Sequence, residues 1–403
     1  MPTQTSRRLK SIPIRQQRGL DAVDHIFAHG PQAKPDQLPL RWAQMAGSEV
    51  KFFRGSAPTF YQLWQRRAPR LGSPAVWLCG DAHLENIGSY RGKNRVAYFD
   101  LTDFDDACLA PLEWELGRAL VGFHVAGAGS LARPFLSSYR QGLIAGKPRH
   151  IEREVAKGAV DKLLRAVAQR KRKEFVHART RHGRLRVQPG ETYALGRAER
   201  ARASTAFRRW AQHRRHAKFF RILDLCGSNS GVGGLGLRRY LVLVKGGRRC
   251  HLIDMKEGAP SALAGACRQA QPGWSCEAER IATVQAYVQY VPIAHLGWLQ
   301  AGKTSFVISD YQPMEDRIDL STLPRSEHRK FAKKWGRLLA WAHLRSASWR
   351  KAAGIDDLVA FGGKLDLARQ RRLLHAAAAI GKTYRSMHRE FRELVDAGTA
   401  TGI

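Results

Sequence analysis

The chain has 403 residues, of which 44% are hydrophobic and 25% charged, a balance that argues for a globular protein of two lobes and against wholesale disorder. Its formal net charge is +34, from 68 Lys and Arg against 34 Asp and Glu, and such a surplus attracts polyanions such as nucleic acid, nucleotides or anionic membrane surfaces. No apolar run reaches the roughly 18 residues of a membrane span and no signal-peptide segment follows the basic N-terminus, so we expect a cytoplasmic protein. The six Cys form no C-x-x-C pair, and we expect them to be reduced thiols.

The first part of the chain is expected to be mostly helical, with short strands in its middle. Residues 1–35 have few periodic apolar positions and indicate an irregular arm. A largely helical, aromatic-rich segment follows at about 40–63, and residues 74–79 have the pattern of a short buried strand that ends at Gly80-Asp81. A second strand is expected at 95–99, and residues 112–180 have helical spacing.

The pattern changes at about residue 219, where β-branched and apolar runs alternate with glycine-rich turns. The predicted elements are strands at 219–225, 240–244 and 250–255, a helix near 275–290, a strand at 305–308, and helices over 325–395. The last region places Phe331, Trp335, Leu338, Leu339 and Ala342 on one helix face. We therefore predict an α+β fold in which a small antiparallel-sheet lobe, 219–318, is inserted between two parts of a mostly helical lobe, 36–218 and 319–403.

An Asp and an Asn stand five residues apart in the loop after the first strand, in Gly80-Asp81-Ala82-His83-Leu84-Glu85-Asn86. This arrangement suits phosphoryl transfer, because the Asp can orient or deprotonate an attacking hydroxyl and the Asn oxygen can bind magnesium. Such a spacing is weak alone, since it occurs by chance in many chains.

A second acidic segment strengthens the hypothesis. Asp103 follows Asn86 by seventeen residues at the end of a predicted strand, and four acids stand between positions 100 and 106 of a very basic protein. A carboxylate at a strand end is the hard oxygen ligand that magnesium bridging two phosphates requires. The alternative is an acidic loop that caps a helix N-terminus.

Three glycines, Gly231, Gly233 and Gly236, form a G-x-G-x-x-G pattern with a strand, not a helix, on each side. Strand, glycine loop and strand is the arrangement that covers ATP phosphates in kinases. Lys256 ends the third strand and is a candidate for binding the α and β phosphates, although a lone strand-end lysine is usually just exposed. A helix carboxylate would have to position it, and Glu277 and Glu279 are the candidates, with Glu279 slightly preferred.

The motifs resemble those of a bacterial family, domain of unknown function 2252. The stretches that carry the resemblance are 52–55 (FFRG), 79–86 (CGDAHLEN), 99–105 (FDLTDFD), 116–120 (LGRAL), the glycine loop, the Lys256 strand and 336–343 (GRLLAWAH). That family has been grouped with the protein-kinase-like fold, beside aminoglycoside and choline kinases, in which a His also follows the catalytic Asp by two residues, as His83 does here. The resemblance covers nearly the whole chain.

Three departures from those kinases and from the family pattern matter. Cys79 stands where the small-molecule kinases have His, and Glu115 stands where the family usually has Asp. The glycine loop and Lys256 come after Asp81 and Asp103, which reverses the usual kinase order. The resemblance therefore implies a two-lobed, circularly permuted kinase-like fold.

The leading hypothesis is an ATP- and Mg²⁺-dependent phosphotransferase acting on an unknown acceptor. In it Asp81 is the catalytic base or orienter, Asn86 and Asp103 bind the metal, and His83 supports Asp81 by hydrogen bonding. Arg54 is either a contact for an anionic substrate or a structural arginine. Transfer of AMP through the same pocket and non-catalytic binding of nucleotide or nucleic acid are the alternatives.

A basic segment, residues 165–218, holds 17 Lys and Arg and three acids, including the run 170–173. It is interpreted either as a solvated helical face or as a binding surface for an anionic substrate or RNA.

Overall fold

The structure is a computed structural model that describes residue 26 and residues 38–229, 236–247 and 249–398. The predicted irregular arm, residues 1–35, lies outside the described residues except for residue 26, and so do Gly231 and Gly233. Within the described part, the chain is a mixture of α-helices and antiparallel sheets, as the sequence predicts.

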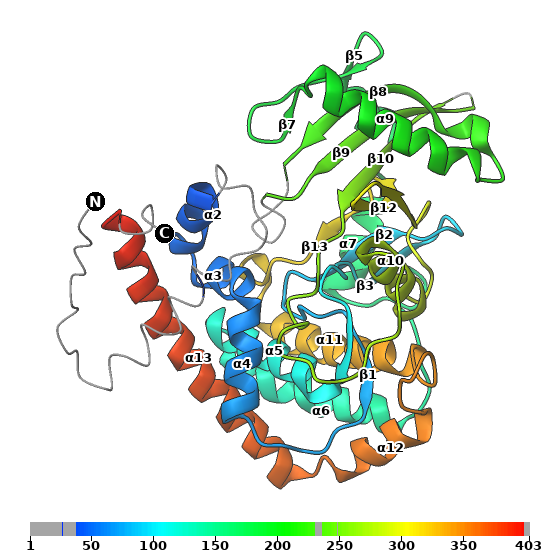
Figure 1. The fold of residues 1–403 in the computed structure, drawn as a ribbon. Helices are drawn as coiled ribbons and strands as arrows, with labels where there is room; N and C mark the ends of the chain where they lie inside the picture. Colours follow the sequence, from blue (N-terminus) through cyan, green and yellow to red (C-terminus); the bar gives the residue numbers. More distant parts are fainter. Residues whose placement is uncertain (1–25, 27–37, 230–235, 248, 399–403) are drawn as a thin grey trace, which may run out of the picture.

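Helices form most of the part of the molecule that lies below the large sheet in Figure 1. The helices of this part are α2 (Leu38–Ala46), α3 (Glu49–Gly55), α4 (Ala57–Arg67), α5 (Leu112–Val125), α6 (Ala132–Ile144), α7 (Ala159–Ala168), α11 (Arg325–Arg345), α12 (Ile355–Lys364) and α13 (Leu367–Asp396). α11 packs along α6, and α13 runs beside α5 and α2. The five apolar residues predicted to share a face of α11 are all buried, which confirms that prediction.

Two small sheets are embedded among these helices. Their strands are β1 (Ala75–Leu78) paired with β4 (Cys108–Pro111), and β13 (Asp316–Arg317), β2 (Ile87–Arg91) and β3 (Ala97–Leu101) in that order. All the pairs are antiparallel. The loop after β1 and the loop after β3 carry the predicted catalytic and metal-binding residues.

A six-stranded antiparallel sheet forms the other part of the molecule, with the order β11-β12-β10-β9-β8-β7. Its strands are β7 (Thr192–Tyr193), β8 (Arg221–Ser228), β9 (Arg239–Gly246), β10 (Arg249–Glu257), β11 (Gly297–Ala301) and β12 (Thr304–Tyr311). The four long strands β8, β9, β10 and β12 begin within two residues of the predicted starts. α10 (Glu277–Val288) connects β10 to β11, where the sequence predicts a helix.

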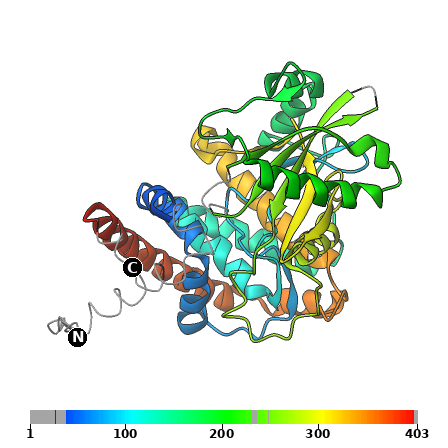
Figure 2. The same cartoon turned by 45° about the horizontal axis from the view of Figure 1, so that its top comes forward.

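Helices on the N-terminal side of residue 219 also pack on this sheet. α9 (Arg197–Gln212) lies across its outer face (Figures 1 and 2), where Phe207 of α9 shares an apolar cluster with Ile253 and Met255 of β10. α8 (Arg172–Ala178) packs on the opposite face, and β5 (Thr180–Arg181) and β6 (Arg184–Leu185) form a small hairpin beside it. The apolar cluster of the sheet therefore includes residues that precede 219.

Within the described residues, no helix is both long enough and apolar enough to span a membrane.

Candidate active site

A cleft of about 1140 Å³ lies between the helical part and the inner face of the large sheet. Asp81, Asn86 and Asp103 line it from the helical side, and Arg239 and Lys256 line it from the sheet. Ligand pockets usually measure about 300 to 1,000 Å³, so the cleft has room for a molecule of nucleotide size and a second substrate.

The turn that presents Asp81 is fixed by Gly80. The φ angle of Gly80 is +95°, and a Cβ atom there would lie 2.0 Å from the backbone oxygen of Asp106, so only glycine fits. The Gly80 amide donates to Glu115 Oε1 at 2.9 Å, and the Tyr61 hydroxyl donates to the Gly80 carbonyl. Both backbone polar groups of Gly80 are thus held by buried side chains.

Beneath the turn, the buried carboxylate of Glu115 links it to the helices. Glu115 Oε2 lies 2.8 Å from His343 Nε2, and His343 Nδ1 lies 2.8 Å from the Tyr139 hydroxyl. All three side chains are fully buried, and together they connect α5, α11 and α6. Glu115, at the position where the sequence departs from the family pattern, is therefore an anchor of the turn that presents Asp81.

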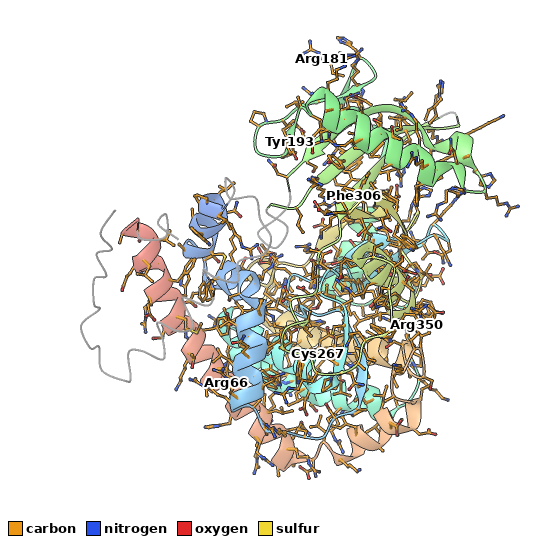
Figure 3. The ribbon with its side chains drawn as sticks, viewed as in Figure 1. Arg66, Arg181, Tyr193, Cys267, Phe306 and Arg350 are labelled. Carbon is orange, nitrogen blue, oxygen red and sulfur yellow. The ribbon has the colours of Figure 1, made fainter. Side chains whose placement is uncertain are left out.

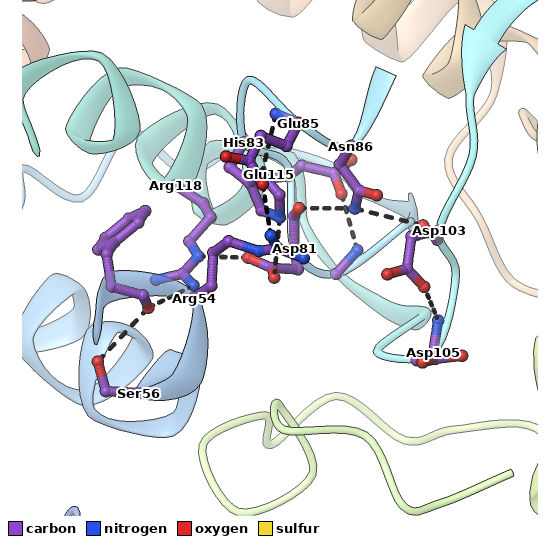
Figure 4. A network of polar contacts seen from close by, with 12 residues as sticks. Arg54, Ser56, Asp81, His83, Glu85, Asn86, Asp103, Asp105, Glu115 and Arg118 are labelled. Carbon is purple, nitrogen blue, oxygen red and sulfur yellow. Dashed lines mark hydrogen bonds and ion pairs between the residues drawn. The ribbon is translucent and has the colours of Figure 1, made fainter. Parts of the chain in front are cut away.

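Asp81 forms a buried ion pair with Arg118 (Figure 4). Arg118 Nε donates to Asp81 Oδ1 at 2.8 Å, and Arg118 Nη2 donates to the Phe53 carbonyl at 2.8 Å. The guanidinium also lies 3.7 Å from the centre of the Phe53 ring. No role for Arg118 was predicted, although it stands in the motif 116–120; its signal is a single cation in an otherwise apolar stretch of α5.

The environment of Asp81 keeps it ionised. Burial raises the pKa of Asp81, but Arg118, His83 and Arg54 more than offset that effect, so the pKa lies well below its ordinary value. His83 Nδ1 accepts a hydrogen bond from the Glu85 amide at 3.1 Å, and His83 Nε2 lies 3.3 Å from Asp81 Oδ2. A carboxylate with so low a pKa is a weak base and a good hydrogen-bond acceptor, which favours the orienting role.

Asn86 connects the two loops. Its Nδ2 donates to the Asp81 carbonyl at 2.8 Å and to the Asp103 carbonyl at 3.5 Å. The nitrogen end of the amide is committed to the backbone, and the oxygen end is the potential cation ligand. The structure thus brings Asp81, Asn86 and Asp103 together in one cleft (Figure 4).

Lys256 reaches the acidic loop from the sheet. Its Nζ forms an ion pair with Asp105 and lies 3.8 Å from Asp103 Oδ1. Burial lowers the pKa of Lys256, but the two carboxylates more than offset this and raise it above its ordinary value. Burial raises the pKa of Asp103, but Lys256, Arg54 and the Asp105 amide together more than offset it, and the net shift is downward. The ammonium and the predicted metal ligand therefore remain charged and adjacent.

Glu277 and Glu279 do not pair with Lys256, in contrast to the prediction. Glu277 Oε2 accepts from Arg280 Nε at 2.7 Å, and Glu279 Oε2 accepts from the amide and hydroxyl of Ser275, both at 2.7 Å. The α10 side chain that reaches the acidic loop is Arg280, which donates to carbonyl oxygens of that loop. The acidic loop, through Asp105 and Asp103, therefore supplies the carboxylates next to the Lys256 ammonium.

The remaining predicted residues are placed less completely. Of the three glycines, the structure describes Gly236, which has a φ of +97° just before β9. Arg54 lines the cleft, and its Nη1 forms a 2.5 Å ion pair with Glu85. Its Nε is buried without a hydrogen-bond partner among the described residues. A buried donor of this kind is costly unless a ligand or water satisfies it.

The sheet contributes one charged pair that the sequence analysis missed. Arg239 Nε and Nη2 donate to the two carboxylate oxygens of Asp254 at 2.7 and 2.9 Å, and both residues line the cleft. Asp254 and Lys256 are two positions apart on β10, so they share a face, and Arg239 pairs with Lys256 in the β9–β10 register. The sequence signal that could have placed Asp254 on the same face as Lys256 is the alternation of side chains along a strand.

The segment after β12 is attached to β2. Gln312 Oε1 accepts from the Arg91 amide at 2.7 Å, and the Ser89 hydroxyl donates to the Met314 carbonyl at 2.7 Å. Arg170 donates to the Pro313 carbonyl at 3.1 Å.

Part of the basic run, residues 170–173, also binds β12 and the segment after it. Arg172 binds both carboxylate oxygens of the buried Asp310 at 2.8 and 2.6 Å. The run 170–173 is thus neither a wholly solvated face nor a free binding surface, because Arg170 and Arg172 bind acceptors on and after β12 and Lys171 pairs with Glu174 at the surface.

Within the described residues, no group of three or more His, Cys, Asp and Glu side chains is arranged to hold a metal ion alone. Magnesium sites that include substrate phosphates typically need only one or two carboxylates. Asp103 and the oxygen of Asn86 fit that smaller requirement.

The fold and the cleft define a two-part α+β protein with a polar site in which acidic loops face a lysine-bearing sheet. The chain belongs to the bacterial family described as "Uncharacterized protein conserved in bacteria (DUF2252)", whose model matches residues 33–394. Comparisons with curated proteins and with solved structures give no match.

Proposed function

We propose that this protein is an ATP- and Mg²⁺-dependent phosphotransferase with a circularly permuted kinase-like fold, acting on a hydroxyl of an unknown acceptor. The observation that carries the proposal is the convergence of Asp81, Asn86, Asp103 and Lys256 on one cleft, with Lys256 Nζ 3.8 Å from Asp103. A protein that only binds anions has no need of three acidic or amide oxygen donors beside its lysine.

In this proposal, the oxygen atoms of Asn86 and Asp103 would hold the magnesium ion, which would neutralise charge on the phosphates of ATP. Lys256 would bind the same phosphates, since its ammonium lies beside the metal ligand. Gly231, Gly233 and Gly236 would supply backbone amides above them, and the surface next to β12 would hold the adenine.

Asp81 would accept a hydrogen bond from the acceptor hydroxyl and orient it toward the phosphoryl group. Its low pKa suits this role better than early proton removal, because a loose phosphoryl-transfer transition state needs little base catalysis. Arg54 would contact the transferred phosphoryl group or an anionic acceptor through its buried Nε.

Two features support a permuted kinase-like arrangement. First, the order of elements along the chain is that of the nucleotide lobe of kinases. Two strands flank a glycine-rich segment, and they are followed by β10 with Lys256 as its penultimate residue, by the helix α10 and by two more strands. Second, the first and last described parts of the helical region are adjacent: His388 Nε2 on α13 lies 2.9 Å from the Ala46 carbonyl on α2. Adjacent ends make a permuted connection sterically simple.

Calorimetric titration of ATP into the protein tests the nucleotide site. Binding should require Mg²⁺, Asp103→Asn should remove that requirement together with most of the affinity, and Lys256→Met should weaken binding by about tenfold or more. Lys245→Met is the matched control, since Lys245 is exposed on the neighbouring strand β9. ATP affinity that is equal with and without Mg²⁺, or equal losses in Lys256→Met and Lys245→Met, would contradict the proposal.

Turnover separates phosphoryl transfer from its alternatives. Asp81→Asn should retain ATP affinity within about twofold while slowing ADP release from ATP, with water as acceptor, by about 100-fold or more, because Asp81 acts on the acceptor and not on the nucleotide. Release of AMP or pyrophosphate instead of ADP would favour nucleotidyl transfer. Binding of ATP without turnover, unchanged in Asp81→Asn, would favour a non-catalytic protein.

A further inference from the structure

The outer face of α9 is separated from the cleft by the whole thickness of the sheet. α9 buries Phe207 and Trp210 against the sheet face that includes Ile253 and Met255. The alternate residues of β10, among them Lys256, point to the cleft on the other face. A molecule bound on the outer side of α9 would therefore leave the cleft open.

This outer face is almost uniformly cationic. Nine Lys and Arg and one acid occur between residues 197 and 221. The acid, Glu199, is engaged, because it accepts a hydrogen bond from the Tyr240 hydroxyl at 2.8 Å. The exposed cations on and just after α9 that no described residue pairs with are Arg197, Arg202, Arg208, Arg209, Arg215 and Lys218, and Arg221 at the start of β8 is exposed as well. Side chains with nitrogen ends project from this helix into solvent in Figure 3.

These cations differ from the basic run earlier in the same segment. Arg170 and Arg172 bind acceptors inside the protein, whereas the six on and just after α9 extend outward without an internal role. Like charges gathered on one helix repel one another, and among the described contacts of α9 the one ion pair that offsets this repulsion joins Arg200 to Asp224. An external polyanion would compensate the remaining repulsion.

The chemistry of the face selects the kind of polyanion. Between residues 197 and 221, all of which the structure describes, no large apolar side chain is exposed. Trp210 is buried, with the Arg214 guanidinium 4.3 Å above its ring. The face therefore offers neither aromatic platforms for the bases of a single strand nor apolar groups to insert into a membrane. It offers a row of guanidinium groups, which suits phosphates on a rigid backbone.

The length of the row also fits. α9 has 16 residues, which corresponds to about 24 Å at 1.5 Å per residue. A nucleic-acid duplex carries one charge per about 1.7 Å of its axis, so several phosphates lie along that length.

We propose that the outer face of α9 binds the phosphate backbone of a nucleic-acid duplex without regard to sequence, on the side of the sheet opposite the cleft. The inference is independent of the proposed phosphotransferase activity. It places the anion-binding part of the basic segment on α9, and not on the run 170–173.

Fluorescence anisotropy with labelled 20-base-pair RNA and DNA duplexes of unrelated sequence tests the proposal. If four of the six cations meet phosphates, the logarithm of affinity should fall with the logarithm of salt concentration with a slope of about −3.6, which is about 150-fold between 50 and 200 mM. Binding to different sequences should agree within about threefold.

Matched triple variants locate the surface. Arg202, Arg208 and Arg209→Gln should weaken duplex binding at 50 mM salt by about tenfold or more and reduce the slope by about 2 to 3. Arg371, Arg372 and Arg389→Gln on the exposed side of α13 removes the same charge and should change affinity by less than about twofold. A single Arg208→Glu variant, which changes one exposed side chain, repeats the test with minimal disturbance of the fold.

Several results would overturn the proposal. Equal losses in the two triple variants would mean attraction by net charge alone. Absence of binding at 50 mM salt, or tighter binding of single strands than of duplexes, would remove the proposed occupant. Binding of vesicles that contain phosphatidylserine, lost in the α9 triple variant without any duplex binding, would assign the face to a membrane surface instead.

Discussion

Replacing Arg118 with Met tests the buried ion pair that holds Asp81. The Arg118 side chain is fully buried and donates two hydrogen bonds of 2.8 Å, to Asp81 and to the Phe53 carbonyl. Removing one member of a buried pair typically costs about 3 to 5 kcal/mol, because the other charge remains desolvated. The Asp81 side chain retains 18% of its exposure, so water relieves part of that penalty, and the expected loss in free energy of unfolding is about 3 kcal/mol.

Urea denaturation followed by tryptophan fluorescence measures this loss. Arg165→Met is the control, since the Arg165 side chain is 67% exposed and its i,i+4 pair with Asp161 should contribute about 0.5 kcal/mol or less. In the double variant Asp81→Asn with Arg118→Met, the isolated charge is absent, so the two single losses should exceed the combined loss by about 2 kcal/mol. A loss below about 1 kcal/mol for Arg118→Met, or additive losses, would refute the reasoning.

The pH dependence of the same variant has a definite sign. In the wild type the pKa of Asp81 is lowered, so its ionised form contributes stability above the unfolded pKa of about 3.9, and this contribution is lost as the pH falls. Without Arg118, burial becomes the dominant effect and raises the pKa of Asp81, so ionisation then destabilises the folded state. The difference in stability between the wild type and Arg118→Met should therefore be largest near neutral pH and shrink below about pH 4. A difference that is constant from pH 3 to 7 would show that the lost energy is not that of the Asp81 charge.

Three further perturbations have matched expectations. Gly80→Ala should lower the free energy of unfolding by more than about 3 kcal/mol, because the new Cβ would lie 2.0 Å from a backbone oxygen. Gly72→Ala, also at positive φ but with nothing within 4 Å of its Cβ, should lower it by about 1 kcal/mol. Equal losses in the two variants would contradict the role of the close contact. Arg172→Gln should lower the free energy of unfolding by about 2 kcal/mol, because the buried carboxylate of Asp310 on β12 then keeps the 3.5 Å ion pair with Arg91 but loses the shorter one with Arg172. Lys171→Gln, at a side chain that is 75% exposed, should change it by less than about 0.5 kcal/mol, and similar values for both would mean that the run is only a solvated face. Burial raises the pKa of Asp106 to about 7, so the contribution of its protonated form to stability is fully present below about pH 4 and is lost as the pH rises through 7. Asp106→Asn should therefore be equally stable at pH 4 and more stable than the wild type at pH 8, by on the order of 1 to 2 kcal/mol after allowance for partial exposure. A gain in stability at pH 4 would contradict the assignment.

Much of the site could be predicted because each of its residues follows a strand with a clear apolar pattern. Asp81 follows β1, Asp103 follows β3, and Lys256 lies near the end of β10, so the strand predictions also located the loops. Convergence of these loops on one cleft was inferred from the chemistry that the residue types share, and the structure brings them together.

The parts that were missed depend on tertiary packing. Arg118 belongs to α5, where thirteen of fourteen residues are buried, so no amphipathic pattern distinguishes a buried cation from an exposed one. Glu279 was chosen for Lys256 by its position after the strand, but the acidic loop approaches Lys256 more closely than α10 does. α9 looks like any basic surface helix, and only its apolar contacts show that it belongs with the sheet.

Short strands were also missed, for a related reason. β11 has five residues and is held in an extended conformation by its pairing with β12. β7 has two residues at the edge of the sheet. Local sequence preference is weak over such lengths, so the partner strand decides the conformation.

A crystal structure of the protein with a non-hydrolysable ATP analogue and Mg²⁺ tests the central claim most directly. The proposal predicts a magnesium ion about 2.1 Å from oxygen atoms of Asn86 and Asp103, and a phosphate within hydrogen-bonding distance of Lys256 Nζ. It also predicts a vacant volume beside Asp81 that is large enough for an acceptor hydroxyl. A nucleotide bound elsewhere, or bound in the cleft with its phosphates directed away from Asp103 and Lys256, would contradict the account.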